Sequence, residues 1–276
     1  MFRSLATISR RDFLQAGTAS IVGATLTSVT SASSRAQGEP RVASVRALVF
    51  DVFGTVVDWR GSVAAEVGEL ARRKGFTVDA ARFADAWRAG YPGSMDRVRR
   101  GDLPWTKLDR LHRMILDAIL ADFRLTGLSE AETDSLNRVW HRLRPWPDAV
   151  RGLTRLKAKF IIAPLSNGNI SLMTDLAKHS GLPWDCILGA ELVRHYKPDR
   201  EVYQSAADFL DLDPAQVMMV AAHLGDLRAA KAVGLKTAFV IRPLEYGPNG
   251  NPDLKGDASV DVEARDFEDL AGRLGA

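Results

Sequence analysis

Between residues 145 and 241 the chain alternates short apolar runs with segments of helical periodicity, and this alternation restricts the fold more than any other feature. The apolar runs cover residues 160–165, 186–192, 217–222 and 237–241, and the helical segments cover residues 170–179, 200–210 and 227–233. Strands that alternate with helices form a parallel sheet with helices on both faces. We therefore predict an α/β fold in which a ligand binds beyond the carboxyl ends of the strands.

An earlier apolar run, residues 45–50, ends directly before Asp51 and has the composition of a buried parallel strand. The block that follows, residues 61–143, shows apolar positions at spacings of three and four and no strand-like run. Breaks at Gly75, 91–93, 103–104 and 126–127 divide this block into about four or five helices. We predict a helical cap over residues 59–144, inserted into a core of residues 45–58 and 145–276.

The formal charge of +3 is carried by the first 36 residues, where four arginines outnumber one aspartate. Removal of this segment leaves a chain with no net charge. Because a polyanion partner requires clustered lysine and arginine, the charge distribution argues against a nucleic-acid ligand.

The amino-terminal segment itself resembles a twin-arginine export signal. Its arginine pair, Arg10 and Arg11, is followed by an uncharged stretch over residues 13–34 and by small residues at a cleavage spacing around Ala36. The alternative is a membrane anchor, but glycine, serine and threonine make the stretch too polar to remain in lipid. We predict export through the twin-arginine machinery to the periplasm or beyond, with signal residues 1–36 removed.

Polar side chains follow the predicted strands at the points where the strands end. These are Asp51, Ser166 with Asn167, Lys197, and His223 with Asp226. Taken alone, an aspartate after a strand is more often a turn or a helix cap than a nucleophile. Because the carboxyl ends of parallel strands meet at one edge, the set together predicts a site there.

Four segments resemble the four motifs of the haloacid dehalogenase superfamily. They are Phe50–Thr55 (FDVFGT), Leu165–Gly168 (LSNG), Lys197–Asp199 (KPD) and the segment around Asp226. The resemblance covers nearly all of residues 45–242. It implies a Rossmann-like parallel sheet core with an inserted helical cap.

Phe53 decides which branch of the superfamily the chain is most similar to. Phosphatases of the superfamily carry a second aspartate at this position, which protonates the leaving group, and use magnesium to hold the phosphate. A phenylalanine ring can neither donate a proton nor tolerate a hydrated dianion beside it, but it can line an apolar pocket for a carbon–halogen bond. An aromatic residue followed by Gly54 and Thr55 is similar to the type II 2-haloacid dehalogenases, and Tyr203, six residues after Lys197, extends the match. The resemblance therefore implies hydrolytic dehalogenation of small (S)-2-haloalkanoic acids to 2-hydroxy acids, without a metal or other cofactor.

In such a reaction Asp51 is the nucleophile and forms an aspartyl-ester intermediate. A displacement needs an ionised carboxylate, and Lys197 is the cation that would keep Asp51 ionised in a dry pocket. Thr55 is expected to donate a hydrogen bond to Asp51. Tyr203 is assigned to the substrate-binding set.

The leaving halide and the substrate carboxylate need donors of their own. Arg88 stands where the family's halide-binding arginine would, and Asn167 can donate its side-chain amide; for Arg88 the alternative is an ordinary solvated helix arginine. Ser166 and the backbone amides near Val52 and Phe53 are expected to hold the substrate carboxylate.

Hydrolysis of the ester requires a water molecule and a group that assists its deprotonation. Asp226 matches the family position associated with this step. His223 stands where many members have asparagine, and it can act as a hydrogen-bond donor or as the base itself. The sequence leaves open whether His223, or Asp226 with Lys197, activates the water.

Two other functions remain as alternatives. Asp51 and Asp226 could hold a cation in a magnesium-dependent phosphohydrolase of the same superfamily, although Phe53 opposes this. A non-catalytic exported binding protein that keeps the scaffold is the second. Relatives are often dimers through cap contacts, so the resemblance also allows a homodimer.

Overall fold

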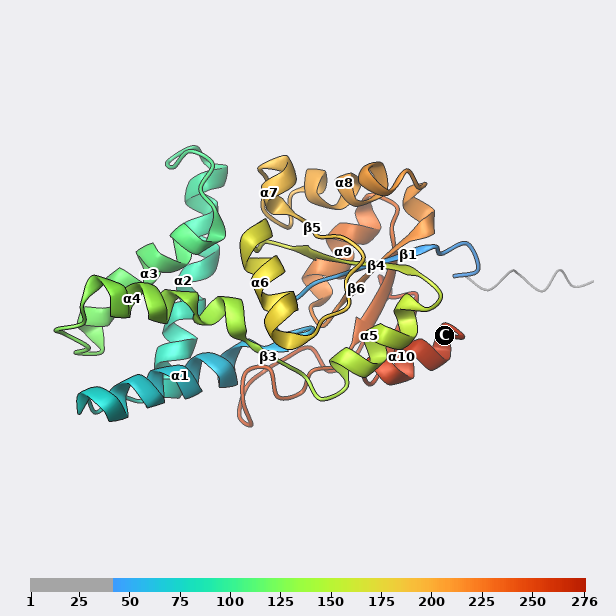
Figure 1. Ribbon diagram of the computed structural model, residues 1–276. Coiled ribbons are helices and arrows are strands. Elements are labelled where there is room, and N and C mark those ends of the chain that lie inside the picture. Colours follow the sequence, from blue (N-terminus) through green and yellow to red (C-terminus); the bar gives the residue numbers. More distant parts are fainter. Residues whose placement is uncertain (1–41) are drawn as a thin grey trace, which may run out of the picture. The chain divides into compact units, whose positions relative to one another are not determined.

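The computed structural model describes residues 42–276, and its core is a six-stranded parallel sheet (Figure 1). The strand order is β5-β4-β1-β6-β7-β8. The strands are β1 (Ala47–Phe50), β4 (Ile161–Ser166), β5 (Leu188–Gly189), β6 (Val217–Ala221), β7 (Lys236–Val240) and β8 (Val262–Ala264). The predicted α/β fold is confirmed, and β1 lies in the middle of the sheet.

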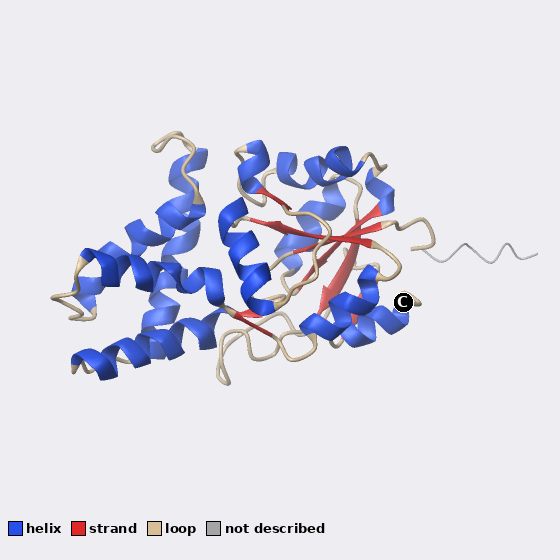
Figure 2. Ribbon diagram, viewed as in Figure 1, coloured by secondary structure: helices blue, strands red, loops and turns tan. Residues whose placement is uncertain are grey.

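Alternate residues of each strand pack on opposite faces of the sheet, which lies between two layers of helices (Figure 2). On one face Leu48 and Phe50 belong to the same apolar cluster as α5 (Ala149–Lys157), α6 (Ile170–Ser180) and α10 (Phe267–Arg273). On the other face Ala47 and Val49 pack with α8 (Arg200–Leu210) and α9 (Leu224–Ala232). Because both faces of the sheet are covered by apolar side chains, a polar site can lie only at the ends of the strands.

The predicted helical block forms four α-helices and a 3-10 helix. They are α1 (Trp59–Lys74), α2 (Ala80–Arg99), α3 (Leu108–Asp122), α4 (Glu130–Asn137) and η1 (Arg138–Arg142). Local signals set several ends: the Asp58 side chain accepts from the Gly61 amide at the start of α1, and Gly75 ends that helix with a φ of 73°. A reciprocal pair of bonds between Ser129 and Glu132 begins α4.

The predicted break at residues 91–93 is wrong, because α2 continues through Pro92. Proline lacks an amide hydrogen, so this helix forgoes one bond to the carbonyl four residues earlier. Phe83, Trp87, Tyr91 and Met95 are all buried on one stripe of α2. Their burial on both sides of the proline outweighs the lost hydrogen bond.

The predicted strand over residues 186–192 is confirmed only at Leu188–Gly189, and the short helix α7 (Ala190–Val193) replaces its second half. Gly189 pairs with Ser166, and a Cβ atom at Gly189 would lie 2.4 Å from the Ser166 backbone oxygen. This close approach ends the strand and turns the chain away. The sequence reading did not identify α5, β8, α10 or the 3-10 helix η2 (Pro214–Gln216).

A second, antiparallel pair of short strands joins the helical block to the sheet. In it β2 (Val57–Asp58) pairs with β3 (Arg144–Pro145). These strands coincide with the predicted ends of the cap, and the division into cap and core itself stays a prediction. The predicted signal peptide lies outside the described residues. Within residues 42–276, no helix combines the length and apolar character needed to span a membrane.

Candidate active site

The structure brings Asp51, Lys197 and Asp226 together at the carboxyl edge of the sheet. Asp51 follows β1, Asp226 lies in the first turn of α9, and Lys197 lies between α7 and α8. The Lys197 Nζ atom is 2.9 Å from Asp51 Oδ1 and 2.6 Å from Asp226 Oδ2. All three side chains are buried, so one ammonium group bridges two carboxylates away from bulk water.

This arrangement separates the properties of the two carboxyl groups. Burial alone would raise the pKa of Asp51, but Lys197 and His223 outweigh it and hold the pKa below its ordinary value. Burial raises the pKa of Asp226, and Lys197 does not fully offset it. Burial lowers the pKa of Lys197, but the two carboxylates raise it overall. The site therefore contains an ionised nucleophile candidate, a fixed cation and a more basic carboxylate.

Thr55 fixes the orientation of Asp51. Its Oγ1 atom accepts a hydrogen bond from the Ala222 amide at 2.9 Å and donates to Asp51 Oδ2 at 2.7 Å. The turn between them contains Gly54 with a φ of 91°, a conformation that favours glycine. The predicted contact between Thr55 and Asp51 is therefore present.

Tyr203 contacts Asp226. Its hydroxyl donates to Asp226 Oδ1 at 2.5 Å, and its side chain is fully buried against the sheet. Burial, with Asp226 nearby, raises the pKa of Tyr203, so its hydroxyl keeps its proton. Sequence reasoning placed Tyr203 with the substrate, whereas the structure places its hydroxyl on the carboxylate beside Lys197.

His223 lies between two carboxylates, one of which the sequence reading missed. Its Nδ1 atom is 3.1 Å from Asp51 Oδ2, and its Nε2 atom is 3.0 Å from each carboxylate oxygen of Glu245. Burial alone would lower the pKa of His223, but Asp51 and Glu245 raise it to about 10. Glu245 lies in the segment after β7, and the end of that predicted strand was the one signal that could have identified it.

Ser166 and Asn167 end β4 beside this cluster. Ser166 is fully buried, and its Oγ atom accepts from the Gly168 amide at 3.0 Å. The Asn167 Oδ1 atom accepts from the Lys197 amide at 2.7 Å, and its Nδ2 group faces the Met95 sulfur at 3.3 Å. Asn167 thus positions the backbone of Lys197 from the neighbouring strand end.

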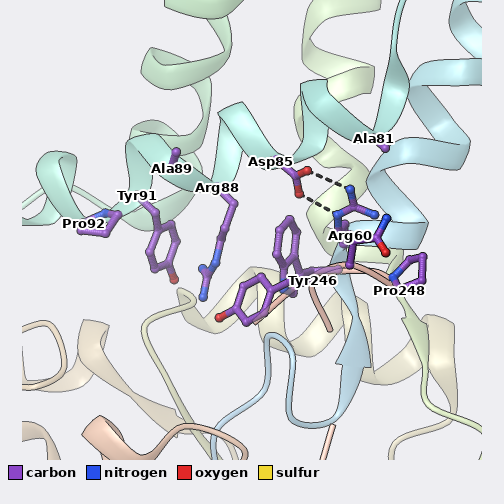
Figure 3. A pocket seen from close by; sticks show the side chains of 12 residues that line it. Arg60, Ala81, Asp85, Arg88, Ala89, Tyr91, Pro92, Tyr246 and Pro248 are labelled. Carbon is purple, nitrogen blue, oxygen red and sulfur yellow. Dashed lines mark hydrogen bonds and ion pairs between the residues drawn. The ribbon is translucent and has the colours of Figure 1, made fainter. Parts of the chain in front are cut away.

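Arg88 projects from α2 into a cavity of 910 Å³ between the helical block and the loop after β7 (Figure 3). Its guanidinium lies 4.2 Å from the centre of the Tyr91 ring and 5.6 Å from the Trp59 ring. Figure 3 shows Tyr246 approaching Arg88 from the opposite wall, and Arg60 paired with Asp85 in the same cavity. The Arg88 Nη1 atom is buried and has no hydrogen-bond partner within residues 42–276.

Phe53, two residues after Asp51, belongs to a buried aromatic cluster. Its ring is buried and contacts Trp140 edge-on, with 5.6 Å between ring centres. His112 stacks on Trp140 at 4.2 Å, and burial lowers its pKa to about 3. His112 is therefore neutral at ordinary pH and belongs to an uncharged aromatic wall.

No group of three or more histidine, cysteine, aspartate or glutamate side chains is arranged to hold a metal ion in the described part of the chain. The site presents a buried nucleophile, a lysine bridge, an aromatic wall and an arginine that is free to bind an anion. This chemistry suits displacement at carbon, with a negative leaving group.

Comparison with known proteins agrees with this chemistry. The family model described as haloacid dehalogenase-like hydrolase matches residues 45–234. The chain is 33% identical to (S)-2-haloacid dehalogenase 1 of a Pseudomonas species, over 73% of this chain and 88% of that protein. Two solved structures, the L-2-haloacid dehalogenase PA0810 and the defluorinating L-2-haloacid dehalogenase Rha0230, are each 50% identical with a TM-score of 0.81. Both alignments cover 84% of this chain, and they cover 99% and 96% of the respective solved chains.

The matched region spans the motifs around Asp51, Ser166, Lys197 and Asp226, and the side chains of Asp51, Lys197 and Asp226 meet at the sheet edge. The chain belongs to the haloacid dehalogenase-like hydrolase family.

Proposed function

We propose that the chain hydrolyses small 2-haloalkanoic acids to 2-hydroxy acids through an ester formed on Asp51. The observation that carries this function is the buried ion pair of Asp51 and Lys197, with a buried phenylalanine, Phe53, two residues after the nucleophile. The 2-haloacid dehalogenases similar to this chain support the same reaction class. Resemblance to this class favours the (S) substrate and inversion at carbon.

Displacement uses the Oδ1 atom of Asp51. Among the described residues, Lys197 is the one hydrogen-bond donor to Oδ1, whereas Oδ2 accepts from Thr55 and faces His223. An electron pair on Oδ1 is therefore available to form a bond to the substrate carbon. The carbon–halogen bond breaks as this bond forms, and the halide leaves with its electron pair.

Arg88 receives the halide in this proposal. Its unpartnered Nη1 group supplies a buried donor where negative charge develops, and its stacking on Tyr91 holds the guanidinium in place. Ser166 and the backbone amides near Val52 and Phe53 bind the substrate carboxylate. The side-chain amide of Asn167, which faces the Met95 sulfur, is the second donor to the halide in this proposal.

Hydrolysis of the ester uses Asp226 as the base. Its raised pKa makes it a better proton acceptor than an exposed aspartate, and Lys197 and Tyr203 fix both of its oxygens. Water gives one proton to Asp226 while its oxygen adds to Cγ of Asp51. When the Cγ–Oδ1 bond breaks, the leaving 2-hydroxy acid takes that proton. The second proton of the water leaves the Asp51 carboxyl group to solvent, which restores the carboxylate.

A magnesium-dependent phosphohydrolase does not fit the residues present. Mg²⁺ prefers oxygen ligands in an octahedral arrangement, and Asp51 and Asp226 would supply only two side-chain carboxylates. Phe53 also offers no oxygen at the position of the phosphatase aspartate.

The test is halide release from (S)-2-chloropropionate, with and without a chelator, by wild type and Asp51→Ala. We expect release by wild type in both conditions and none by the variant. Loss of halide release with chelator, restored by magnesium, would support the metal-dependent alternative. Turnover of an aryl phosphate without halide release would exclude dehalogenation.

We also propose that the protein reaches the periplasm through the twin-arginine machinery. The support is the arginine pair Arg10–Arg11 and the uncharged stretch after it. A homodimer through the helical block is the assembly that the family resemblance favours. Light scattering of the purified mature chain would distinguish a monomer from that dimer.

A further inference from the structure

The hydrogen-bond partners of His223 determine its protonation state. Its Nδ1 atom faces Asp51 Oδ2, and its Nε2 atom faces both oxygens of Glu245. An ionised carboxylate can only accept hydrogen bonds, so both ring nitrogens must donate. His223 is therefore an imidazolium in the resting site, with no free lone pair for a proton from water.

Glu245 is held firmly in this position. Its side chain is only 1% exposed, and the indole of Trp59 donates to its Oε1 atom at 3.2 Å. The carboxylate packs against Gly54, where a Cβ atom would lie 2.1 Å from Oε1. A buried carboxylate is costly unless it is paired, and the paired cation here is His223.

Arg242 fixes the loop that carries Glu245 to the turn from Asp51 to Thr55. The Glu245 amide donates to the Arg242 carbonyl at 3.2 Å, and Arg242 Nε donates to the Thr55 carbonyl at 2.8 Å. Two further bonds join Arg242 to Asp148 at the start of α5. The position of the Glu245 carboxylate is thus set by the segment after β7 rather than by the turn from Asp51 to Thr55.

We propose that Glu245 is a positioning residue that keeps His223 cationic, so that His223 donates to the oxygen of the Asp51 ester that becomes negatively charged during hydrolysis. This inference rests on the proposed function and deepens it.

The order in which bonds form in the reaction explains why the charge of Glu245 is needed after the ester has formed. Once Oδ1 is alkylated, Oδ2 is the carbonyl oxygen of a neutral ester, and Asp51 no longer attracts the proton of His223. Glu245 is then the remaining carboxylate in contact with the ring. When water adds to Cγ, the electron pair of the C=O bond moves to Oδ2, where His223 and Thr55 donate.

The charged groups around His223 are compatible with this role. Asp51 faces the ring from the end of β1, and Glu245 faces it from the loop after β7. Lys197 and Asp226 lie beyond Asp51, and the pKa of Lys197 is raised above its ordinary value of 10.5.

The test separates ester formation from ester cleavage in rapid-mixing experiments with (S)-2-chloropropionate. Halide is measured for the first step, and mass spectrometry measures alkylated Asp51 for the second. We expect Glu245→Gln to slow ester cleavage by about 10- to 100-fold, comparable to or below the loss of one oxyanion donor. The halide burst should remain, and the ester should accumulate.

Two further readings distinguish positioning from a general loss of structure. In Glu245→Gln the pKa of His223 falls, so ester cleavage should decline with rising pH at a lower pH than in wild type. In a His223→Asn background, Glu245→Gln should add almost no further slowing, because its partner is absent. The exposed histidine–glutamate pair His195 and Glu201 supplies the matched control, since Glu201→Gln should leave both steps unchanged.

Ester cleavage in Glu245→Gln at the wild-type rate would overturn the proposal. A rise in cleavage as His223 loses its proton, at a pH above the acidic limb that Asp226 produces, would also overturn it, because neutral His223 would then be the base. Independent, additive effects of the two substitutions would also overturn it. If Glu245→Gln fails to fold, Glu245→Asp, which keeps the charge but withdraws it from the His223 ring, should shift the decline of ester cleavage to a lower pH than in wild type. An unchanged pH profile in that variant would overturn the proposal. An absent halide burst in wild type would instead refute the proposed dehalogenation.

Discussion

At the scale of single residues, the two oxygens of Asp51 have different surroundings. Lys197 holds Oδ1, whereas Thr55 and His223 surround Oδ2. The less constrained oxygen can attack, and the other becomes the carbonyl oxygen of the ester. This difference between the two oxygens predicts that the 2-hydroxy acid product contains the Oδ1 atom of Asp51.

This assignment predicts the fate of labelled water. In a single turnover in heavy-oxygen water, the first 2-hydroxy acid should contain the old Oδ1 of Asp51, and the solvent oxygen should appear in Asp51. Mass spectrometry of the product and of the peptide containing Asp51 measures both. Label in the first-turnover product would instead indicate direct attack by water.

Tyr203 leads to a prediction about pH dependence. Its hydroxyl lowers the pKa of Asp226, which burial has raised, and Asp226 must be ionised to act as a base. Asp226 is active above its pKa and inactive below it. In Tyr203→Phe that pKa rises further, so the acidic limb of the kcat profile should move to higher pH.

The same variant tests where Tyr203 acts. Since its hydroxyl contacts Asp226 rather than the cavity lined by Arg88, KM for (S)-2-chloropropionate should stay close to wild type. A raised KM with an unchanged kcat profile would return Tyr203 to the substrate-binding set.

Residue-scale prediction from sequence worked where a polar side chain directly follows a strand. Asp51 and Ser166 were found in this way because the carboxyl ends of parallel strands share one edge. Glu245 was not found, because four residues separate it from the end of β7. A loop of that length does not fix the direction of a side chain, and Gly54, Trp59 and Arg242 do so only in the folded chain.

At the scale of elements, helix α2 shows how packing overrides a local signal. Pro92 lies inside the helix and cannot donate to the carbonyl of Arg88. The buried stripe around it keeps the helix continuous, which no local propensity reveals.

Replacement of this proline should therefore stabilise the fold. We expect Pro92→Ala to raise the free energy of unfolding by about 1–3 kcal/mol, since alanine restores one amide donor and has the higher helix propensity. Urea unfolding followed by circular dichroism measures the change. Equal or lower stability would mean that the break in hydrogen bonding is needed for the packing of α2.

A histidine in η1 connects two helices that are distant in sequence. His141 Nε2 is 3.0 Å from Asp109 of α3, and Nδ1 is 2.8 Å from Asp175 of α6. Burial alone would lower the pKa of His141, but Asp109 and Asp175 raise it overall. The protonated ring therefore joins the helical block to a helix that covers the sheet.

This contact predicts how stability depends on pH. Because the pKa of His141 is raised on folding, its contribution is complete below the unfolded value of about 6.5 and is lost as pH rises through the folded pKa. Wild type should thus lose more unfolding free energy than His141→Gln as pH increases across that range. Urea unfolding at several pH values measures the free energy of unfolding of both proteins. An equal decrease with pH in wild type and in His141→Gln would contradict this prediction.

Element boundaries show the limits of sequence reading in another way. Residues 200–210 formed the predicted helix α8 because apolar periodicity and a preceding proline coincide there. Residues 186–192 split into β5 and α7 because Gly189 approaches the backbone of Ser166. That approach depends on the neighbouring strand, which a local pattern does not contain.

At the scale of the whole molecule, the order of the sheet places β1 between β4 and β6. Asp51 consequently receives neighbours from both sides, with Lys197 and His223 on segments far apart in sequence. Alternation of strands and helices was sufficient to predict the parallel sheet. It could not predict β8 and α10, whose short segments carry little periodic signal.

The predicted leader gives a whole-molecule expectation. The mature protein from its natural host should begin near Gln37, because small residues around Ala36 match a cleavage site. Amino-terminal sequencing or intact-mass measurement checks this. A substitution of both arginines, Arg10→Lys with Arg11→Lys, should leave the precursor unprocessed, and an intact Met1 on the wild-type protein would contradict export.

The antiparallel pair of β2 and β3 brings the two ends of the helical block side by side, with Val57 opposite Pro145. The chain therefore leaves the sheet and returns to it at the same point. The length of the polypeptide between β2 and β3 does not affect the pairing of the strands in the sheet. We expect that segments of other lengths could be grafted between residues 58 and 144 without shifting the strand register. Substrate choice could then diversify in lineages that keep the same nucleophile.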